Sequence, residues 1–548
     1  MVNRALAAAA AFTALTPMAA FAQSNLPQPV ESQALQSLDA WSVSAVSRQD
    51  GALPSDLWTR SDPEFLALAF DRLPAVYESP ATLALARRVL FSGGDAPRGD
   101  AALAARKRFE ALGKMGAADE LSVMAAGSRA AATDPGVAMF AAQAELARGR
   151  RTEACARGRN ANAGDNPPPF FLRLRAYCAA VTGDRAAADL ALELARAQNA
   201  ADNWYTGAVA AAGGAPGARP PAAQYDNSLS AALSLAAQLR PGANALANSS
   251  TLALVTIART ENAPQPQRAQ ATALAFRRGA LSAEEARTIL AATPAEVTTG
   301  LPPIVVALRR IQTVTPPPAA AGSEAGVVSV LETSAAIADV LRASTAPADF
   351  AAAARFFHAE IAASTTAPDA ASAVLFARAA LINGDAQNGQ RLIASARQAG
   401  ADEAALAPLD AALVALAGPR GDSGTMAMHR RIDAAGTGAR ARGTARDVAI
   451  LAALGAPVDG GVQTFVIANA PQGGARAESG AMLALASAVE RGAVGEGALL
   501  AVVAAGEGGP ARLDAESVER IIRALRGLRL EDDARRIAVE AILAGAPS

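Results

Sequence analysis

The chain has 548 residues, of which 51% are hydrophobic and 4% aromatic, and its 50 basic and 51 acidic residues nearly cancel. This balance implies no basic face for nucleic acid. Alanine, the best helix former, recurs along the whole sequence, and the length exceeds what one compact core usually holds. We therefore expect an all-α protein, built as several domains or as one elongated array.

Residues 1–22 are typical of a secretory signal peptide. Arg4 supplies the positive start, residues 5–16 are mostly apolar and small, and residues 20–22 (Ala-Phe-Ala) match the small–x–small pattern of signal peptidase. The apolar run is shorter than the about 20 residues that span a bilayer. We expect cleavage after Ala22, a periplasmic location and no membrane span in the mature chain.

Helix starts are marked by capping residues. Ser61 precedes Asp62, Pro63 and Glu64, which together predict a capping box with proline in the first turn. Further starts are predicted at Ser79-Pro80, at Asp134-Pro135, at Ser282 with Glu285, and at Asp514.

Apolar residues recur at helical spacing in several segments. In residues 516–527 the apolar positions are Val518, Ile521, Ile522 and Leu525, which predict one buried stripe. In residues 184–198 the predicted stripe is Ala187, Leu190, Ala191 and Leu194. Residues 371–382 are apolar nearly all round, so we expect that helix to be covered on most sides.

Two segments share a Gly-Asp turn after a largely apolar helix. They are TGDRAAADLALELA at 182–195 and NGDAQNGQRLIASA at 383–396. In this the chain resembles tetratricopeptide and Sel1-type helical-hairpin repeats, and the superhelical region of periplasmic lytic transglycosylases without their catalytic domain. The resemblance covers most of the mature chain and implies degenerate hairpins. We expect an α-solenoid of stacked antiparallel helix pairs in two arrays.

Proline and glycine mark the expected boundaries. The predicted organisation is a signal peptide at 1–22, an N-terminal segment with partial helix at 23–60, an N-terminal helical-repeat array at 61–312, a Pro/Ala/Gly linker at 313–326, and a C-terminal helical-repeat array at 327–548 with a glycine-rich insertion near 418–442.

The two cysteines of the chain, Cys155 and Cys178, lie 23 residues apart on neighbouring predicted helices. An oxidising compartment permits a disulfide between them, which we predict. The alternatives are two buried thiols or a metal pair, although no histidine lies near either cysteine.

One motif resembles a catalytic site. Glu478, with Ser479 and Gly480, resembles the Glu-Ser-Gly of lytic transglycosylases, in which the glutamic acid protonates the glycosidic oxygen. The Phe-Asn that follows in that family is replaced by Ala481-Met482, and its later Gly-Leu-Met-Gln segment is missing. The alternative is a glutamate at a helix start after a glycine-rich turn.

Other chemistry-bearing residues are few. His358 and His429 are the only histidines, which excludes a multi-histidine zinc site, and we interpret both as structural or solvated. Trp204 and Tyr205 form a candidate contact patch, because exposed aromatic residues often anchor partners. The alternative is that they are buried and bridge weakly packed helices.

We therefore expect a non-catalytic periplasmic scaffold or adaptor that binds proteins or peptides of an envelope complex, without a cofactor or metal. The alternatives are a divergent peptidoglycan-acting glycosidase that uses Glu478, and a module that binds the cell wall.

Overall fold

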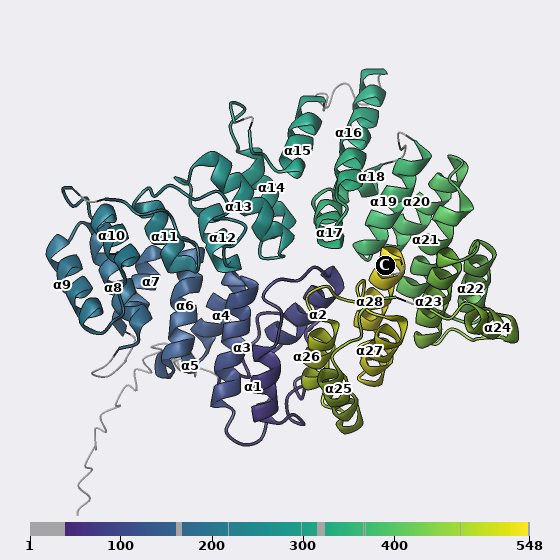
Figure 1. Ribbon diagram of the computed structural model, residues 1–548, viewed down its shortest axis with the longest axis horizontal. Helices are drawn as coiled ribbons and strands as arrows, with labels where there is room; N and C mark the ends of the chain where they lie inside the picture. Colours follow the sequence, from purple (N-terminus) through teal and green to yellow (C-terminus); the bar gives the residue numbers. More distant parts are fainter. Residues whose placement is uncertain are drawn as a thin grey trace, which may run out of the picture. The chain divides into compact units, whose positions relative to one another are not determined.

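Helices form every regular element in the part of the chain that the structure describes, which confirms the all-α fold class (Figure 1). The structure is a computed structural model that describes residues 39–160, 167–217, 219–297, 299–314, 324–364, 367, 369–471 and 473–545. The predicted signal peptide and residues 315–323 of the predicted linker lie outside these ranges.

In chain order, the first ten helices are α1 (Pro63–Asp71), α2 (Pro80–Phe91), α3 (Ala102–Met115), α4 (Ala118–Gly127), α5 (Ala130–Thr133), α6 (Pro135–Ala147), α7 (Arg151–Asn160), α8 (Pro169–Thr182), α9 (Arg185–Ala197) and α10 (Asn203–Ala212). The next nine are α11 (Ser228–Ala236), α12 (Thr251–Arg259), α13 (Gln265–Arg277), α14 (Ala283–Ala291), α15 (Pro303–Val314), α16 (Glu324–Ala343), α17 (Pro347–Phe356), α18 (His358–Ala363) and α19 (Ala370–Ile382). The last nine are α20 (Ala386–Gln398), α21 (Glu403–Ala417), α22 (Ser423–Asp433), α23 (Ala439–Ala453), α24 (Gly460–Ala468), α25 (Ser479–Arg491), α26 (Val494–Ala505), α27 (Ala515–Gly527) and α28 (Glu531–Ala544).

Most predicted helix starts are confirmed. Ser79, Asp134, Ser282 and Asp514 each accept a backbone N–H of the first turn of the helix that follows them. The prediction that Ser61 caps the first helix is wrong. Asp62 is the cap of α1 and accepts the N–H groups of residues 64 and 65, because it directly precedes the proline that opens the helix.

The helix α27 has the predicted amphipathic build. Its buried side chains include Val518, Ile521, Ile522 and Leu525. On its outer side two ion pairs form between residues four positions apart, with 2.6 Å between Glu516 and Arg520 and 2.6 Å between Glu519 and Arg523. The apolar helix α19 contacts α16, α17, α18, α20, α21 and α28, so it is covered as predicted.

The predicted stripe of α9 is wrong. The helix buries Ala188, Leu192 and Ala195, whereas Leu190 is 73% and Leu194 41% exposed. The sequence places apolar side chains on two adjacent faces of this helix. The face that packs against α8 is the one richer in alanine, whose small side chains allow helices to approach closely.

Consecutive helices pair as hairpins at both predicted Gly-Asp turns, α8 with α9 and α19 with α20. Gly183 and Gly384 adopt φ angles of 79° and 78°, which favour glycine, and the aspartates that follow cap α9 and α20. The solenoid arrangement and its division into two arrays stay predictions. The expected insertion near 418–442 contains α22, which packs between α21 and α23.

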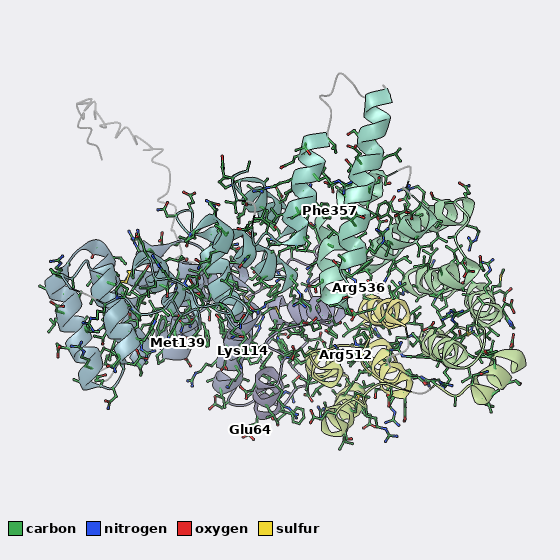
Figure 2. All side chains as sticks on the ribbon, turned by 45° about the horizontal axis from the view of Figure 1, so that its top comes forward. Glu64, Lys114, Met139, Phe357, Arg512 and Arg536 are labelled. Atoms are coloured by element: carbon green, nitrogen blue, oxygen red, sulfur yellow. A yellow bond between two sulfur atoms is a disulfide. The ribbon has the colours of Figure 1, made fainter. Side chains whose placement is uncertain are left out.

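The first helices of the described chain pack against the last ones. The helix α2 contacts both α26 and α28, and α1 contacts α26 (Figure 1). By its contacts, Leu38–Ser548 forms one compact unit. The described side chains lie between neighbouring helices and on their outer faces (Figure 2).

Residues 39–60 are the described part of the segment 23–60, for which we expected partial helix, and they form turns and bends whose tryptophans are buried. Trp41 and Trp58 are buried in an edge-to-face contact with ring centroids 5.4 Å apart, and both lie beside Phe70 of α1. A Cβ atom on Gly495, in α26, would lie 2.5 Å from the Trp58 ring. Glycine at 495 therefore allows the N-terminal segment to approach α26.

The contact between α2 and α28 contains a buried carboxyl group. Glu540 is 3% exposed and accepts hydrogen bonds from Ser79 Oγ at 2.8 Å and from the Ala81 N–H at 2.9 Å. Burial raises the pKa of Glu540 to about 7. Two neighbouring carboxyls, Asp533 beside Arg88 and Glu496 beside Arg491, also have pKa values raised by burial.

Two buried arginines donate hydrogen bonds to backbone carbonyl groups of loops and helix ends. Arg108 of α3 is completely buried, and burial lowers its pKa to about 9. Arg446 of α23 is 1% exposed, and burial lowers its pKa as well. The carbonyl oxygens that accept their hydrogen bonds belong to Ala40, Trp41, Val43, Leu90 and Ser92 for Arg108, and to Pro510, Leu513, Ala541 and Gly545 for Arg446.

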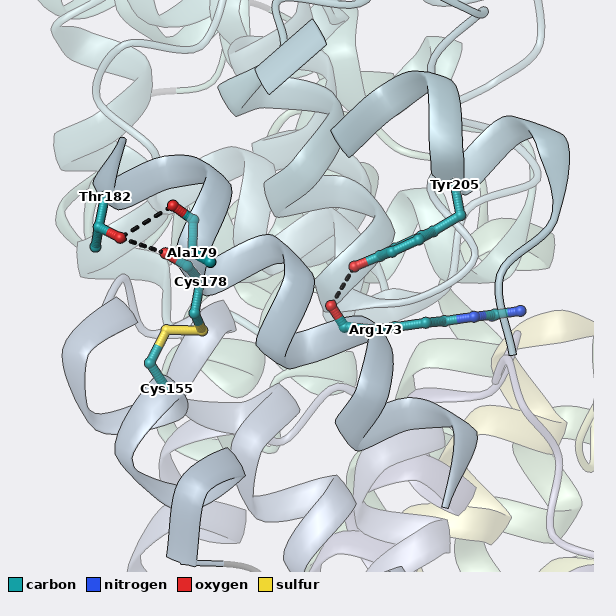
Figure 3. Close-up of a disulfide and its surroundings, with 6 residues drawn as sticks. All are labelled: Cys155, Arg173, Cys178, Ala179, Thr182 and Tyr205. Carbon is teal, nitrogen blue, oxygen red and sulfur yellow. Dashed lines mark hydrogen bonds between the residues drawn. A yellow bond between two sulfur atoms is a disulfide. The ribbon is translucent and has the colours of Figure 1, made fainter. Parts of the chain in front are cut away.

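Cys155 and Cys178 form the predicted disulfide, with their Cα atoms 5.9 Å apart (Figure 3). The bond joins α7 to α8. At the end of α8, Thr182 donates its hydroxyl to the carbonyl oxygens of Cys178 and Ala179, both at 3.0 Å.

We predict that Glu540 makes the protein less stable as the pH rises. The unfolded carboxyl ionises near the ordinary pKa of 4.5 and the folded one near 7, so the folded state binds the proton more tightly. The free energy of unfolding should therefore fall between these pH values, by roughly 3 kcal/mol at most from this group. Urea unfolding at pH 5 and pH 8 should show a smaller fall for Glu540→Gln than for wild type.

The matched control is Glu516→Gln, which removes an exposed carboxylate of α27. This variant should keep the pH dependence of the wild type. An equal fall in wild type and Glu540→Gln would contradict the burial of Glu540 against α2.

We predict that the disulfide stabilises the pairing of α7 with α8. In the chain-entropy model, closing a loop of this length contributes about 3 kcal/mol. The variant Cys155→Ser with Cys178→Ser should lose a comparable free energy of unfolding in urea, and reductant should destabilise the wild type but leave the variant unchanged. A variant as stable as the oxidised wild type would show that the bond adds nothing.

Candidate binding site

An apolar pocket of about 710 Å³ lies between α13, α15, α16, α17 and the segment 241–247. The residues that form its apolar lining are Pro241, Leu246, Pro266, Leu274, Phe276, Leu301, Pro302, Pro303, Ile304 and Val340. We call this site the apolar pocket.

Prolines gather at this site because helices begin there. Pro266 lies in the first turn of α13, and Pro303 is the first residue of α15. Proline suits these positions because the first turn of a helix leaves its N–H groups without intrahelical partners. The four proline rings therefore add apolar surface and contribute no backbone N–H donor.

Two glutamines supply polar groups in the wall of the apolar pocket. Gln270 donates its Nε2 to the Gly300 carbonyl at 2.8 Å. Gln267, which is 8% exposed, donates its Nε2 to the hydroxyl of Tyr225. Each side-chain amide is thus held in one orientation.

Arg277 fixes one wall of the apolar pocket. Its Nη2 donates to both carboxylate oxygens of Glu78 at 3.0 Å, and its Nε donates to Asp349 of α17. This guanidinium ties α13 to α17 and to the segment before α2. The wall is therefore braced by ion pairs across three stretches of chain.

A second, central cavity of about 530 Å³ lies on the other side of Phe276, between α2, α17, α28 and the turn from α13 to α14. Arg87 donates to the Gly279 carbonyl at 2.8 Å and to Glu120 at 2.6 Å. Arg355 donates to the Phe276 carbonyl at 3.1 Å, and burial, followed by the charge of Arg87, lowers its pKa to about 10. These arginines bind groups of the chain itself, so they serve the packing of the helices around this cavity.

The structure places Glu478 on the surface. It precedes the first residue of α25, its side chain is 45% exposed, and it forms an ion pair with Arg72. This is the position that the alternative interpretation predicted, a glutamate at a helix start. A general acid for glycosides needs a desolvated cleft, and Glu478 does not line the pocket that lies beside α25.

Tyr205 joins α10 to α8, and Trp204 joins α10 to the loop before α11. Tyr205 is 3% exposed and donates its hydroxyl to the Arg173 carbonyl of α8 (Figure 3). Trp204 is half-buried and donates its Nε1 to the Ala222 carbonyl at 2.7 Å. Tyr205 thus matches the buried alternative and offers little surface to a partner, whereas Trp204 stays partly exposed.

Both histidines are exposed. His429 Nε2 lies 2.6 Å from Asp459 Oδ2, and His358 Nδ1 lies 3.4 Å from Asn383 Nδ2. Within the described ranges, no group of three or more His, Cys, Asp or Glu side chains is placed to hold a metal ion.

Sequence reasoning missed the apolar pocket, because its walls come from five separate segments. One usable signal was Leu301-Pro302-Pro303, an apolar residue next to two prolines at a helix start. For the central cavity, the usable signal was the single charge in otherwise apolar runs, as at Arg355 and Glu540, because such residues are rarely buried without a partner.

No helix in the described part of the chain is both long and apolar enough to cross a membrane. Comparisons of the chain with protein-family models, with curated proteins and with solved structures found no match.

Proposed function

We propose that the chain is an exported, non-catalytic helical scaffold that binds an apolar peptide segment of a protein partner in the apolar pocket. The composition of that pocket carries the proposal. Binding sites for small ligands and peptide side chains are concave, mostly apolar and supplied with a few fixed polar groups. A site of about 710 Å³ lies within their usual range of volumes.

The chemistry of the walls favours a peptide. Leu246, Leu274 and Leu301 are partly exposed, so they offer apolar surface to a side chain that enters. Gln270 is partly exposed and adds an amide group, which suits the alternating donors and acceptors of a peptide backbone. Helical-hairpin proteins, which this sequence resembles, bind extended peptides and proteins.

Two features support export to the periplasm. The first 22 residues match a signal peptide. The disulfide between Cys155 and Cys178 is the kind of bond that persists in an oxidising compartment and is rare in the cytosol.

The exposed, ion-paired Glu478 supports a role without catalysis. Its partner Arg72 is also 45% exposed, so solvent reaches both side chains. We therefore propose binding of an envelope protein in preference to cleavage of the cell wall.

The test is selection of peptides from a displayed random library on the purified protein, followed by fluorescence-polarisation titration of an enriched peptide. We predict apolar peptides, and an affinity at least about tenfold weaker for Leu301→Glu, because a charge placed in the pocket must be desolvated when the peptide binds. Val306→Glu is the matched control. Val306 is 55% exposed on the same segment and does not line the pocket, so this variant should bind like wild type.

Equal loss of affinity in both variants, or no enrichment of apolar peptides, would contradict the proposal. Sedimentation with isolated cell walls tests the remaining alternative, a module that binds the cell wall and not a peptide. Binding to cell walls that Leu301→Glu leaves unchanged would indicate a cell-wall-binding module.

A further inference from the structure

Four arginines line one pocket at the junction of the two ends of the described chain. The pocket has a volume of about 760 Å³ and is formed by residues 48–60, Arg88, residues 492–494 and residues 527–530. The charged residues in its lining are Arg48, Arg60, Arg88, Arg529 and Asp56. We call this site the arginine pocket.

Two of these arginines are anchored by the chain. Arg88 donates its Nε to the Gly51 carbonyl at 2.7 Å and forms an ion pair with Asp533. Arg60 donates to the Arg491 carbonyl at 3.3 Å, at the end of α25. A Cβ atom on Gly492 would lie 2.7 Å from Arg60 Nη1, so glycine there leaves room for this guanidinium.

The other two arginines have no such anchor. Arg48 and Arg529 are exposed, and neither guanidinium forms a hydrogen bond or an ion pair with any residue in the described ranges. Arg529 also adopts a φ of 61°, a left-handed conformation that arginine rarely takes. Many arginines elsewhere in the chain pair with a carboxylate, as Arg87 does with Glu120 and Arg259 with Glu285.

The arginine pocket therefore carries an excess of positive charge in a chain whose net charge is −1. Four guanidinium groups face only the carboxylate of Asp56 within the lining and that of Asp533 on Arg88. Guanidinium groups bind phosphate oxygens through pairs of parallel N–H donors, and several of them around one space suit a ligand with more than one negative charge.

We propose that the arginine pocket binds the dianionic phosphate group of a phosphomonoester, either of a small molecule or of a lipid headgroup. Arg88 and Arg60 provide guanidinium groups that the chain holds in place, and Arg48 and Arg529 provide the N–H donors that remain free. A single carboxylate would neutralise only part of this charge. The inference does not depend on the proposed peptide binding, which uses a different pocket.

Isothermal titration of the purified protein tests the proposal with inorganic phosphate, methyl phosphate and acetate. Phosphate and methyl phosphate should bind with Kd of about 1 mM or tighter at low salt, and acetate at least about tenfold more weakly. Sedimentation with vesicles that contain phosphatidic acid, compared with pure phosphatidylcholine vesicles, identifies a lipid source. Binding of such vesicles without binding of methyl phosphate assigns the group to a lipid.

The variant Arg48→Gln with Arg529→Gly should bind phosphate and phosphatidic acid at least about tenfold more weakly. Glycine suits the backbone of residue 529, so the melting temperature should stay the same or rise, which excludes unfolding as the cause. Arg520→Gln, which removes an exposed arginine of α27 outside the pocket, should bind like wild type. Failure of both phosphate and vesicles to bind the wild type, or equal binding by the wild type and the double variant, would overturn the proposal.

Discussion

A carboxyl group of α28 accepts two hydrogen bonds at the start of α2, and the contact around it joins the two ends of the described chain. Glu540 accepts these bonds from Ser79 and Ala81. Further along the same two helices, Arg88 of α2 forms an ion pair with Asp533 of α28. Both cavities that touch α2 depend on this contact. The central cavity lies between α2 and α28, and the arginine pocket lies between residues 48–60 and the ends of α25 and α27.

Alanine-rich helices explain why charged groups hold this structure together. Alanine packs helices closely but leaves little side chain to fix the loops between them. Arg108 and Arg446 meet this need, because each donates its guanidinium hydrogen bonds to carbonyl groups of a loop and of the end of a neighbouring helix. A buried charge is costly unless its hydrogen bonds are satisfied, and the carbonyl oxygens satisfy those of both arginines in large part. Arg277 also joins separate elements, but through carboxylates. Its ion pairs with Asp349 of α17 and with Glu78 brace a wall of the apolar pocket.

Local features of the chain were predictable from sequence, and its long-range contacts were not. The caps at Ser79 and Asp514, the stripe of α27 and the disulfide follow from residue type and spacing over a few turns. The stripe of α9 was wrong because alanine and leucine occupy two faces, and only the partner helix decides which face is buried. The arginine pocket joins segments that lie hundreds of residues apart, 48–60 and 492–530, and no spacing rule reports such a contact.

Crosslinking across the junction tests the packing of the two chain ends most directly. Arg72 and Glu478 are exposed and form an ion pair between the end of α1 and the start of α25, and the two native cysteines are already joined. The variant Arg72→Cys with Glu478→Cys should form an intramolecular crosslink with a short bis-maleimide, detected in the monomer by mass spectrometry after proteolysis. Complete labelling of both thiols by a mono-maleimide, without any intramolecular crosslink by the short reagent, would contradict the packing of the first helices against the last.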